Sequence, residues 1–319
     1  MKSIPQRIAE ELTVKETQVS AAIGLLDEGA TVPFVARYRK EVTGGLDDTQ
    51  LRHLEERLRY LRELEERRET ILNSIDEQGK LTDTLKKSIL DADTKNRLED
   101  LYLPYKPKRR TKAQIAREAG LEPLAHALFE NPQLVPEQEA EQYIDKDKEV
   151  PDVKAALDGA RQILMEEFAE DADLLQKLRD YLWQNGVVES RVIEGKENDG
   201  AKFSDYFEYD EAISKIPSHR ALALFRGRNE GVLQVNLKVA GEDEMESHPC
   251  EQIIAQHFNI EQQDVAADKW LNDTVRWAWK ITIFTHLDPE LTMKLKAAAE
   301  QEAIQLFSSN RKQHLRAAA

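Results

Sequence analysis

The chain is poor in cysteine, in turn-forming residues and in long apolar runs. Cys250 is its only cysteine, which excludes an intrachain disulfide and a thiolate zinc cluster within one chain. Only 13 glycines and 11 prolines occur in 319 residues, which favours long helices over a loop-rich sandwich. No run approaches the roughly 18 apolar residues of a membrane span, and the N-terminus lacks the apolar core of a signal peptide. We therefore expect a soluble, cytoplasmic protein with no membrane partner.

Positive charge is scarce as well. There are 45 Lys and Arg residues against 60 Asp and Glu, a formal net charge of −15, which argues against a small basic DNA-binding domain. The charge is uneven, however. Residues 130–180 hold 15 acidic and 6 basic residues, whereas residues 102–120 hold six basic residues and one acidic residue. Because the negative net charge is an average over such unlike segments, it does not exclude a contact between one basic segment and nucleic acid.

Apolar periodicity predicts a mainly α-helical, multi-helical fold. The longest seam runs at helical 3–4 spacing from Leu51 to Ile75, after the capping residues Asp47 and Asp48, and Glu65 and Arg68 interrupt it. Shorter helices are predicted at residues 82–90, 111–119, 153–168 and 172–184.

Extended structure is predicted at three places. Residues 31–36 and 187–193 look like short extended segments, and residues 221–225 and 232–239 flank a glycine-bounded turn that predicts a β-hairpin. We therefore divide the chain into a helical domain at 1–186, a small mixed α/β subdomain at 187–262 and a long helical segment at 263–319.

Within the last segment, a helix is expected from about residue 264 to residue 285. Trp270, Trp277, Ile281 and Phe284 share its face, and Asp288 and Pro289 predict a restart of the helix. We expect the tryptophans, Trp279 included, in the core, because large aromatic residues dominate helix packing.

Enzyme motifs are missing. The sequence has no glycine-rich phosphate loop, and its seven histidines form no i, i+4 pair that could share a metal ion. The only His/Cys cluster, His248 with Cys250, has too few ligands for a metal and is interpreted as a loop beside a buried thiol. We therefore expect no catalytic residues, no metal and no cofactor.

The sharpest local feature is the basic segment at residues 102–112. Two prolines keep the segment extended, and its cations project from a loop just before a helix N-terminus, which favours phosphate. Two tyrosines beside them could stack on bases. In the alternative interpretation, the tyrosines pack in the core and the basic run is a solvated loop facing an acidic neighbour. The candidate nucleic-acid-binding residues are Tyr102, Tyr105, Lys106, Lys108, Arg109, Arg110 and Lys112.

A second basic group lies at Arg37, Arg39 and Lys40, around Tyr38. It has the same two interpretations, and the adjacent Glu41 reduces its positive charge.

Several of these stretches together resemble the bacterial transcription accessory protein Tex family. The similar stretches are TVPFVARYRKEVTGGL at 31–46, LEDLYLPYKPKRRTK at 98–112, AREAGLEPL at 116–124 and FSDYFEY at 203–209. The resemblance spans essentially the whole chain and implies a helical N-terminal half with a helix-turn-helix-like portion. It also implies that full-length members continue with an RNase H-like domain, helix-hairpin-helix elements and an S1-type OB-fold. We expect this chain to end in the helix that leads into the RNase H-like domain.

By this resemblance, the function is that of the N-terminal scaffold of a transcription accessory factor. The first hypothesis is weak, sequence-independent binding of RNA or DNA through the two basic groups, since the family's general affinity is attributed chiefly to its OB-fold. The alternative is a protein–protein interaction module for RNA polymerase or a ribosome-associated partner, without nucleic-acid affinity. A hydrolase or nuclease is disfavoured.

Overall fold

The computed structural model describes the backbone of residues 2–317 and the side chains of residues 2–306. The chain forms two compact units, Met1–Pro107 and Lys108–Ala319. This division falls within the segment that the sequence grouped as one helical domain; the boundaries at 186 and 262 stay predictions. The last two residues of the predicted 263–319 segment, and its side chains from residue 307 on, lie outside the described residues. No described helix is long and apolar enough to cross a membrane.

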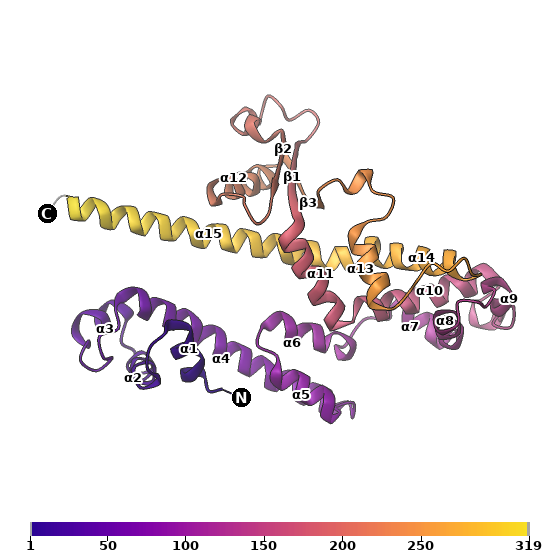
Figure 1. Cartoon of the computed structure of the whole chain (residues 1–319), viewed down its shortest axis with the longest axis horizontal. Helices are drawn as coiled ribbons and strands as arrows, with labels where there is room; N and C mark the ends of the chain where they lie inside the picture. Colours follow the sequence, from indigo (N-terminus) through magenta and orange to yellow (C-terminus); the bar gives the residue numbers. More distant parts are fainter. Residues whose placement is uncertain (1, 318–319) are drawn as a thin grey trace. The chain divides into compact units, whose positions relative to one another are not determined.

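The first unit is entirely helical and is organised around its longest helix, α4 (Figure 1). Its elements are α1 (Ile4–Leu12), α2 (Glu16–Asp27), α3 (Val32–Tyr38), α4 (Asp48–Glu77), α5 (Asp83–Asp91), α6 (Lys95–Tyr102) and the 3₁₀ turn η1 (Leu103–Tyr105). Asp47 caps α4, since its carboxylate accepts from the Gln50 N–H at 2.8 Å. The predicted leucine seam is confirmed: Leu51, Leu54, Leu58, Leu61 and Ile75 are buried.

Arg68, expected to interrupt the seam, is instead buried within it. Its Nη1 donates to the carbonyl oxygens of Ile89 at 2.5 Å and Leu90 at 3.1 Å, and its Nε donates to Glu65 at 3.0 Å. The two interrupting residues thus pair with each other, and the guanidinium satisfies carbonyl groups at the end of α5.

The extended stretch predicted at residues 31–36 is wrong, because those residues open helix α3. Pro33 lies in the first turn, where a helix needs no backbone donor. Val32 and Val35, three residues apart, are both buried, so tertiary packing outweighs the β-propensity of valine.

The second unit combines helices with one small sheet. Its elements are α7 (Lys112–Glu118), α8 (Glu122–Glu130), α9 (Pro136–Glu141), η2 (Lys146–Lys148), α10 (Val153–Ala169), α11 (Ala172–Asn185), β1 (Gly186–Val192), η3 (Ala201–Tyr206), β2 (Glu208–Ala212), α12 (Ser218–Asn229), β3 (Leu233–Val239), η4 (Glu242–Glu244), α13 (Pro249–His257), α14 (Asp268–Trp277), the π-helix η5 (Ala278–Ile283) and α15 (Phe284–Ala317).

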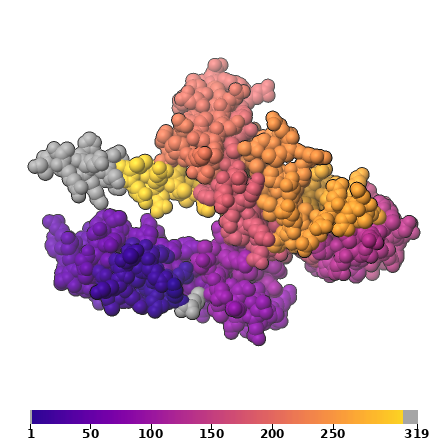
Figure 2. All heavy atoms as spheres, in the orientation of Figure 1, coloured from indigo at the N-terminus to yellow at the C-terminus, as the bar shows by residue number. Residues whose placement is uncertain are grey.

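The sheet is antiparallel with strand order β2-β1-β3. Val188 of β1 lies opposite Glu211 on one side and Leu237 on the other. Helix α12 contacts both β3 and α15, and Figure 2 shows the sheet and α12 as a lobe that protrudes from the rest of this unit. The mainly helical fold with a small sheet and a long C-terminal helix is therefore confirmed.

The hairpin predicted around residues 226–231 is wrong, since only its second strand exists, as β3. Residues 221–225 belong to α12. Ala221, Leu224 and Phe225 are buried at i, i+3 and i+4, a helical face that the apolar run had concealed. Gly231, at φ +69°, follows the helix end.

The π-helix changes which tryptophan faces the core. Its wider i→i+5 turn rotates the residues that follow, so Trp279 and Ile283 are buried while Ile281 is exposed. Trp270 is buried as expected, at 6% exposure, but Trp277 is 44% exposed and the prediction for it is wrong. The restart predicted at Pro289 is also wrong.

Helix α15 continues through Pro289. The proline removes a backbone donor only from the carbonyl of Thr285, which lies on the exposed side of the helix.

Candidate nucleic-acid interface

The two tyrosines of the basic segment belong to the core of the first unit. Tyr102 ends α6 and is 7% exposed; its hydroxyl lies 2.9 Å from Ser74 Oγ, and the Arg67 guanidinium lies 5.4 Å from its ring centroid. Tyr105 is half-buried against the same core, and its carbonyl accepts from Gln78 Nε2 at 2.9 Å. The stacking role predicted for Tyr102 is therefore corrected, because its ring is not available to a ligand.

Two of the five cations in the segment form ion pairs with carboxylates of the second unit. Lys108 pairs with Glu170 of α10, and Arg110 donates from Nε to Glu118 of α7 at 3.1 Å. Burial lowers the pKa of Lys108, although the nearby Glu166 carboxylate acts in the opposite direction. Part of the basic run thus faces an acidic neighbour, as the alternative interpretation expected.

The other three cations remain available. Lys106, Arg109 and Lys112 are exposed, and their side chains form no ion pair with any residue of the part that the structure describes. They alternate in sequence with the two paired cations. The segment therefore separates into side chains that hold the fold and side chains that face solvent.

Hydrogen bonds at the start of α7 also hold the basic segment against α10. The Thr111 hydroxyl accepts from the Gln114 N–H at 3.0 Å and donates to Glu166 at 2.9 Å. Arg117 Nη1 lies 2.6 Å from the same carboxylate. Burial would raise the pKa of Glu166, but hydrogen bonds from Arg117 and Thr111 outweigh it and hold the pKa below its usual range. These contacts fix α7 on α10.

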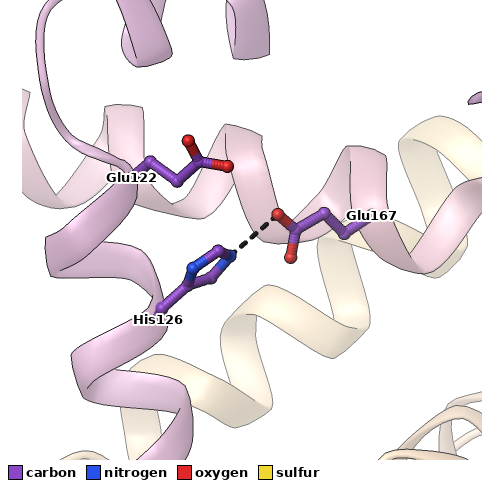
Figure 3. Close-up of side chains that lie close together, drawn as sticks. All are labelled: Glu122, His126 and Glu167. Carbon is purple, nitrogen blue, oxygen red and sulfur yellow. Dashed lines mark hydrogen bonds and ion pairs between the residues drawn. The ribbon is translucent and has the colours of Figure 1, made fainter. Parts of the chain in front are cut away.

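Sequence reasoning missed one cluster of possible metal ligands, Glu122 and His126 of α8 with Glu167 of α10 (Figure 3). Their ligand atoms lie within 4.8 Å of one another, and His126 Nε2 is 2.9 Å from Glu167. The available signal was a Glu–His pair at i, i+4 on one helix. Arg117 lies 3.5 Å from Glu122 and 3.8 Å from Glu167, so a guanidinium already neutralises these carboxylates. We assign the cluster to the ion network that joins α8 to α10.

The second basic group lies at the end of α3. Phe34 and Tyr38 are 42% and 56% exposed, with ring centroids 5.4 Å apart. Arg39 lies 5.6 Å from the Phe34 ring and Arg37 lies 5.5 Å from the Tyr38 ring, while Lys40 is exposed. The arginines therefore occupy the aromatic rings by cation–π contact.

Two family profiles match the chain. One, described as Tex-like protein N-terminal domain, matches residues 2–76, and the other, Tex central region-like, matches residues 131–307. Arg37, Arg39 and Lys40 lie inside the first match, whereas the basic segment at 102–112 lies between the two.

Relatives in other organisms agree with these matches. Protein YhgF of Escherichia coli (strain K12) is 59% identical over 306 residues, which cover 95% of this chain and 40% of that protein. Transcriptional accessory protein Tex of Neisseria gonorrhoeae is 56% identical over 319 residues, covering 99% of this chain and 41% of that protein. The human S1 RNA-binding domain-containing protein 1 is 29% identical, over 97% of this chain and 32% of that protein.

The chain spans about two fifths of the length of these bacterial relatives. The central-region profile by itself covers more than half of the chain, in addition to the N-terminal match. On this evidence the chain belongs to the Tex family.

Proposed function

We propose that this chain is the non-catalytic N-terminal scaffold of a cytoplasmic transcription accessory factor and that it binds RNA or DNA without sequence preference. The observation that carries this proposal is that Lys106, Arg109 and Lys112, within a seven-residue stretch, form no ion pair with any of the residues that the structure describes. The relatives named for transcription and for RNA binding support the choice of ligand.

The ion pairs of the basic segment indicate which of its cations are available to a ligand. Lys108 and Arg110 pair with Glu170 and Glu118, whereas the other three cations of the segment have no carboxylate partner among the described residues. Cations that remain unpaired beside paired ones are available to phosphate oxygens, whose contacts are independent of sequence. Three contacts are few, so the affinity of this chain is expected to be weak and strongly dependent on salt.

The proposal predicts a measurable salt slope. The affinity for a fluorescent single-stranded 20-mer, as RNA and as DNA, is measured by anisotropy across a salt series. Loss of three phosphate contacts in the K106Q/R109Q/K112Q variant lowers the slope of log K against log salt by about 2 for a single strand.

The matched control is K80Q/K86Q/K87Q, which removes three exposed lysines from the first unit that likewise form no ion pair among the described residues. This control should bind as the parent chain does. An affinity that does not change with salt, or a control that loses as much as K106Q/R109Q/K112Q, would refute the proposal.

A second candidate function is an interaction module for RNA polymerase or a ribosome-associated protein. The observation in its favour is a set of exposed apolar side chains on α15: Met293 at 72%, Ile304 at 70% and Leu306 at 53% exposure. A partner retained on the immobilised chain after nuclease treatment, and lost from an M293S/I304S/L306S variant, would support it. Loss of that partner on digestion alone would count against it.

A further inference from the structure

Trp277 is an exposed aromatic residue in a protein that buries its neighbours. Trp270 and Trp279 are 6% and 4% exposed, whereas Trp277 is 44% exposed at the last residue of α14. Trp277 lies seven residues after Trp270 on the same face of α14, and the Arg161 guanidinium contacts both rings, at 5.7 Å from Trp270 and 5.4 Å from Trp277.

Trp277 lines a pocket of about 580 Å³ in the second unit, which we call the α7–α10 pocket. The walls come from α7, from residues 148–150, from α10 and from Trp277. Gly159 lies in this wall, and a Cβ there would meet Leu121 Cδ1 at 2.3 Å. The wall is therefore closely packed, and the volume lies within the range of about 300–1,000 Å³ that is typical of small-molecule sites.

The charge of the lining is opposite to that of the chain. Four cations face two carboxylates: Lys112, Lys148, Lys154 and Arg161 against Glu149 and Asp158. Asp158 is shared by Lys154 at 3.2 Å and Arg161 at 3.3 Å. The Arg161 guanidinium also lies 5.4 Å from the Trp277 ring centroid, where it positions the ring by cation–π contact.

Lys112 connects this pocket to the basic segment. It is the last of the three unpaired cations and also lines the pocket. The exposed indole shares the pocket with Lys112 and with Lys154, whose side chain is 85% exposed in its pair with Asp158. An aromatic ring and exposed lysines are the two elements of a single-strand site, in which a base stacks on the ring and its phosphates contact the lysines.

We propose that the α7–α10 pocket binds one unpaired nucleobase of single-stranded RNA or DNA, stacked on Trp277, with flanking phosphates held by Lys112 and Lys154. This inference rests on the proposed nucleic-acid binding and names the site where a base, as distinct from the phosphate backbone, is recognised. It predicts a preference for single strands over duplexes, because a stacked duplex base cannot reach Trp277.

The test compares a 12-mer of thymidylate with a 12-mer of the same phosphate backbone without bases, at low salt. The parent chain should bind the base-containing strand roughly tenfold more tightly, since stacking on one aromatic residue is worth about 1–3 kcal/mol. The W277A variant should lose this preference and W277F should keep most of it. I281A is the matched control, because Ile281 is a 56% exposed apolar residue that does not line the pocket.

The outcomes separate the inference from the function on which it rests. If W277A retains the preference, or if the parent chain binds both strands equally but in a salt-dependent way, the base site is refuted and phosphate binding stands. If neither strand binds, both proposals fail. Equal competition by polyglutamate would also overturn the base site and assign the pocket to an acidic peptide.

Discussion

Replacing Arg117 by methionine tests whether the ion network on α10 fixes the basic segment in place. Arg117 Nη1 lies 2.6 Å from Glu166, with Glu122 at 3.5 Å and Glu167 at 3.8 Å. Methionine keeps most of the aliphatic length and removes the charge, so the three carboxylates lose their shared cation. We therefore expect the second unit to be destabilised.

The expected loss of stability in R117M follows from the burial of the Arg117–Glu166 pair. Arg117 and Glu166 are 24% and 18% exposed, so the pair is neither fully buried nor screened like a surface ion pair. A charge-assisted hydrogen bond in this setting is worth about 2 kcal/mol, which lowers the melting temperature of a unit of this size by roughly 4–8 °C. The control R110M breaks an exposed pair with Glu118 and should cost under about 0.5 kcal/mol.

The contribution of Glu166 to the stability of the second unit should depend on pH. The folded-state pKa of Glu166 lies below its ordinary value of 4.5, so its contribution to stability is fully present above that value. The contribution is lost as pH falls through the folded-state pKa, because the protonated carboxyl no longer pairs with Arg117. The difference between R117M and the parent chain should therefore be largest near pH 7 and shrink in acid.

Urea unfolding of the parent chain, R117M, E166Q and the double variant measures the coupling between these two residues directly. We expect a coupling free energy of about 1–2 kcal/mol and an unchanged salt slope of nucleic-acid binding in R117M, since Arg117 is not one of the unpaired cations. A coupling near zero at pH 7 would refute the structural role assigned to Arg117.

Two further predictions concern single buried groups. R68M should destabilise the first unit by about 1–3 kcal/mol in urea unfolding, because the carbonyls of α5 lose a buried donor, whereas R52M, which breaks an exposed pair on the same helix, should change stability by under about 0.5 kcal/mol. Equal effects of the two would contradict the assignment. Burial raises the pKa of the Cys250 thiol, so it should resist a thiol reagent in the native chain and react once urea unfolds it. Fast labelling of the native chain would show that the thiol is accessible.

Much of the fold could be predicted because helical periodicity is a local signal. The seam on α4 and the cap Asp47 were visible in the sequence and are confirmed. The errors occurred where tertiary packing outweighed propensity. Val32 and Pro33 open a helix, and the run around Leu224 is helical because one of its faces is buried against neighbouring elements.

The candidate interface, too, was only partly predictable from the sequence. The sequence by itself determined that five cations gather in one segment, since that requires only counting. It could not separate Lys108 and Arg110, which have carboxylate partners, from Lys106, Arg109 and Lys112, which have none among the described residues. The partner of Lys108 lies 62 residues further along the chain, so packing of α7 on α10 made this distinction.

The helical class, the position of the basic segment and the resemblance to the Tex family follow from the residue pattern alone. The packing of the helices, by contrast, makes Tyr102 a core residue and leaves Trp277 exposed in a pocket that Lys112 also lines. The physical reason is that burial depends on which helix faces meet. The repeat of 3.6 residues shows which side chains share a face, but it does not show which part of that face a neighbouring helix covers, so Trp270 is buried and Trp277 on the same face is exposed.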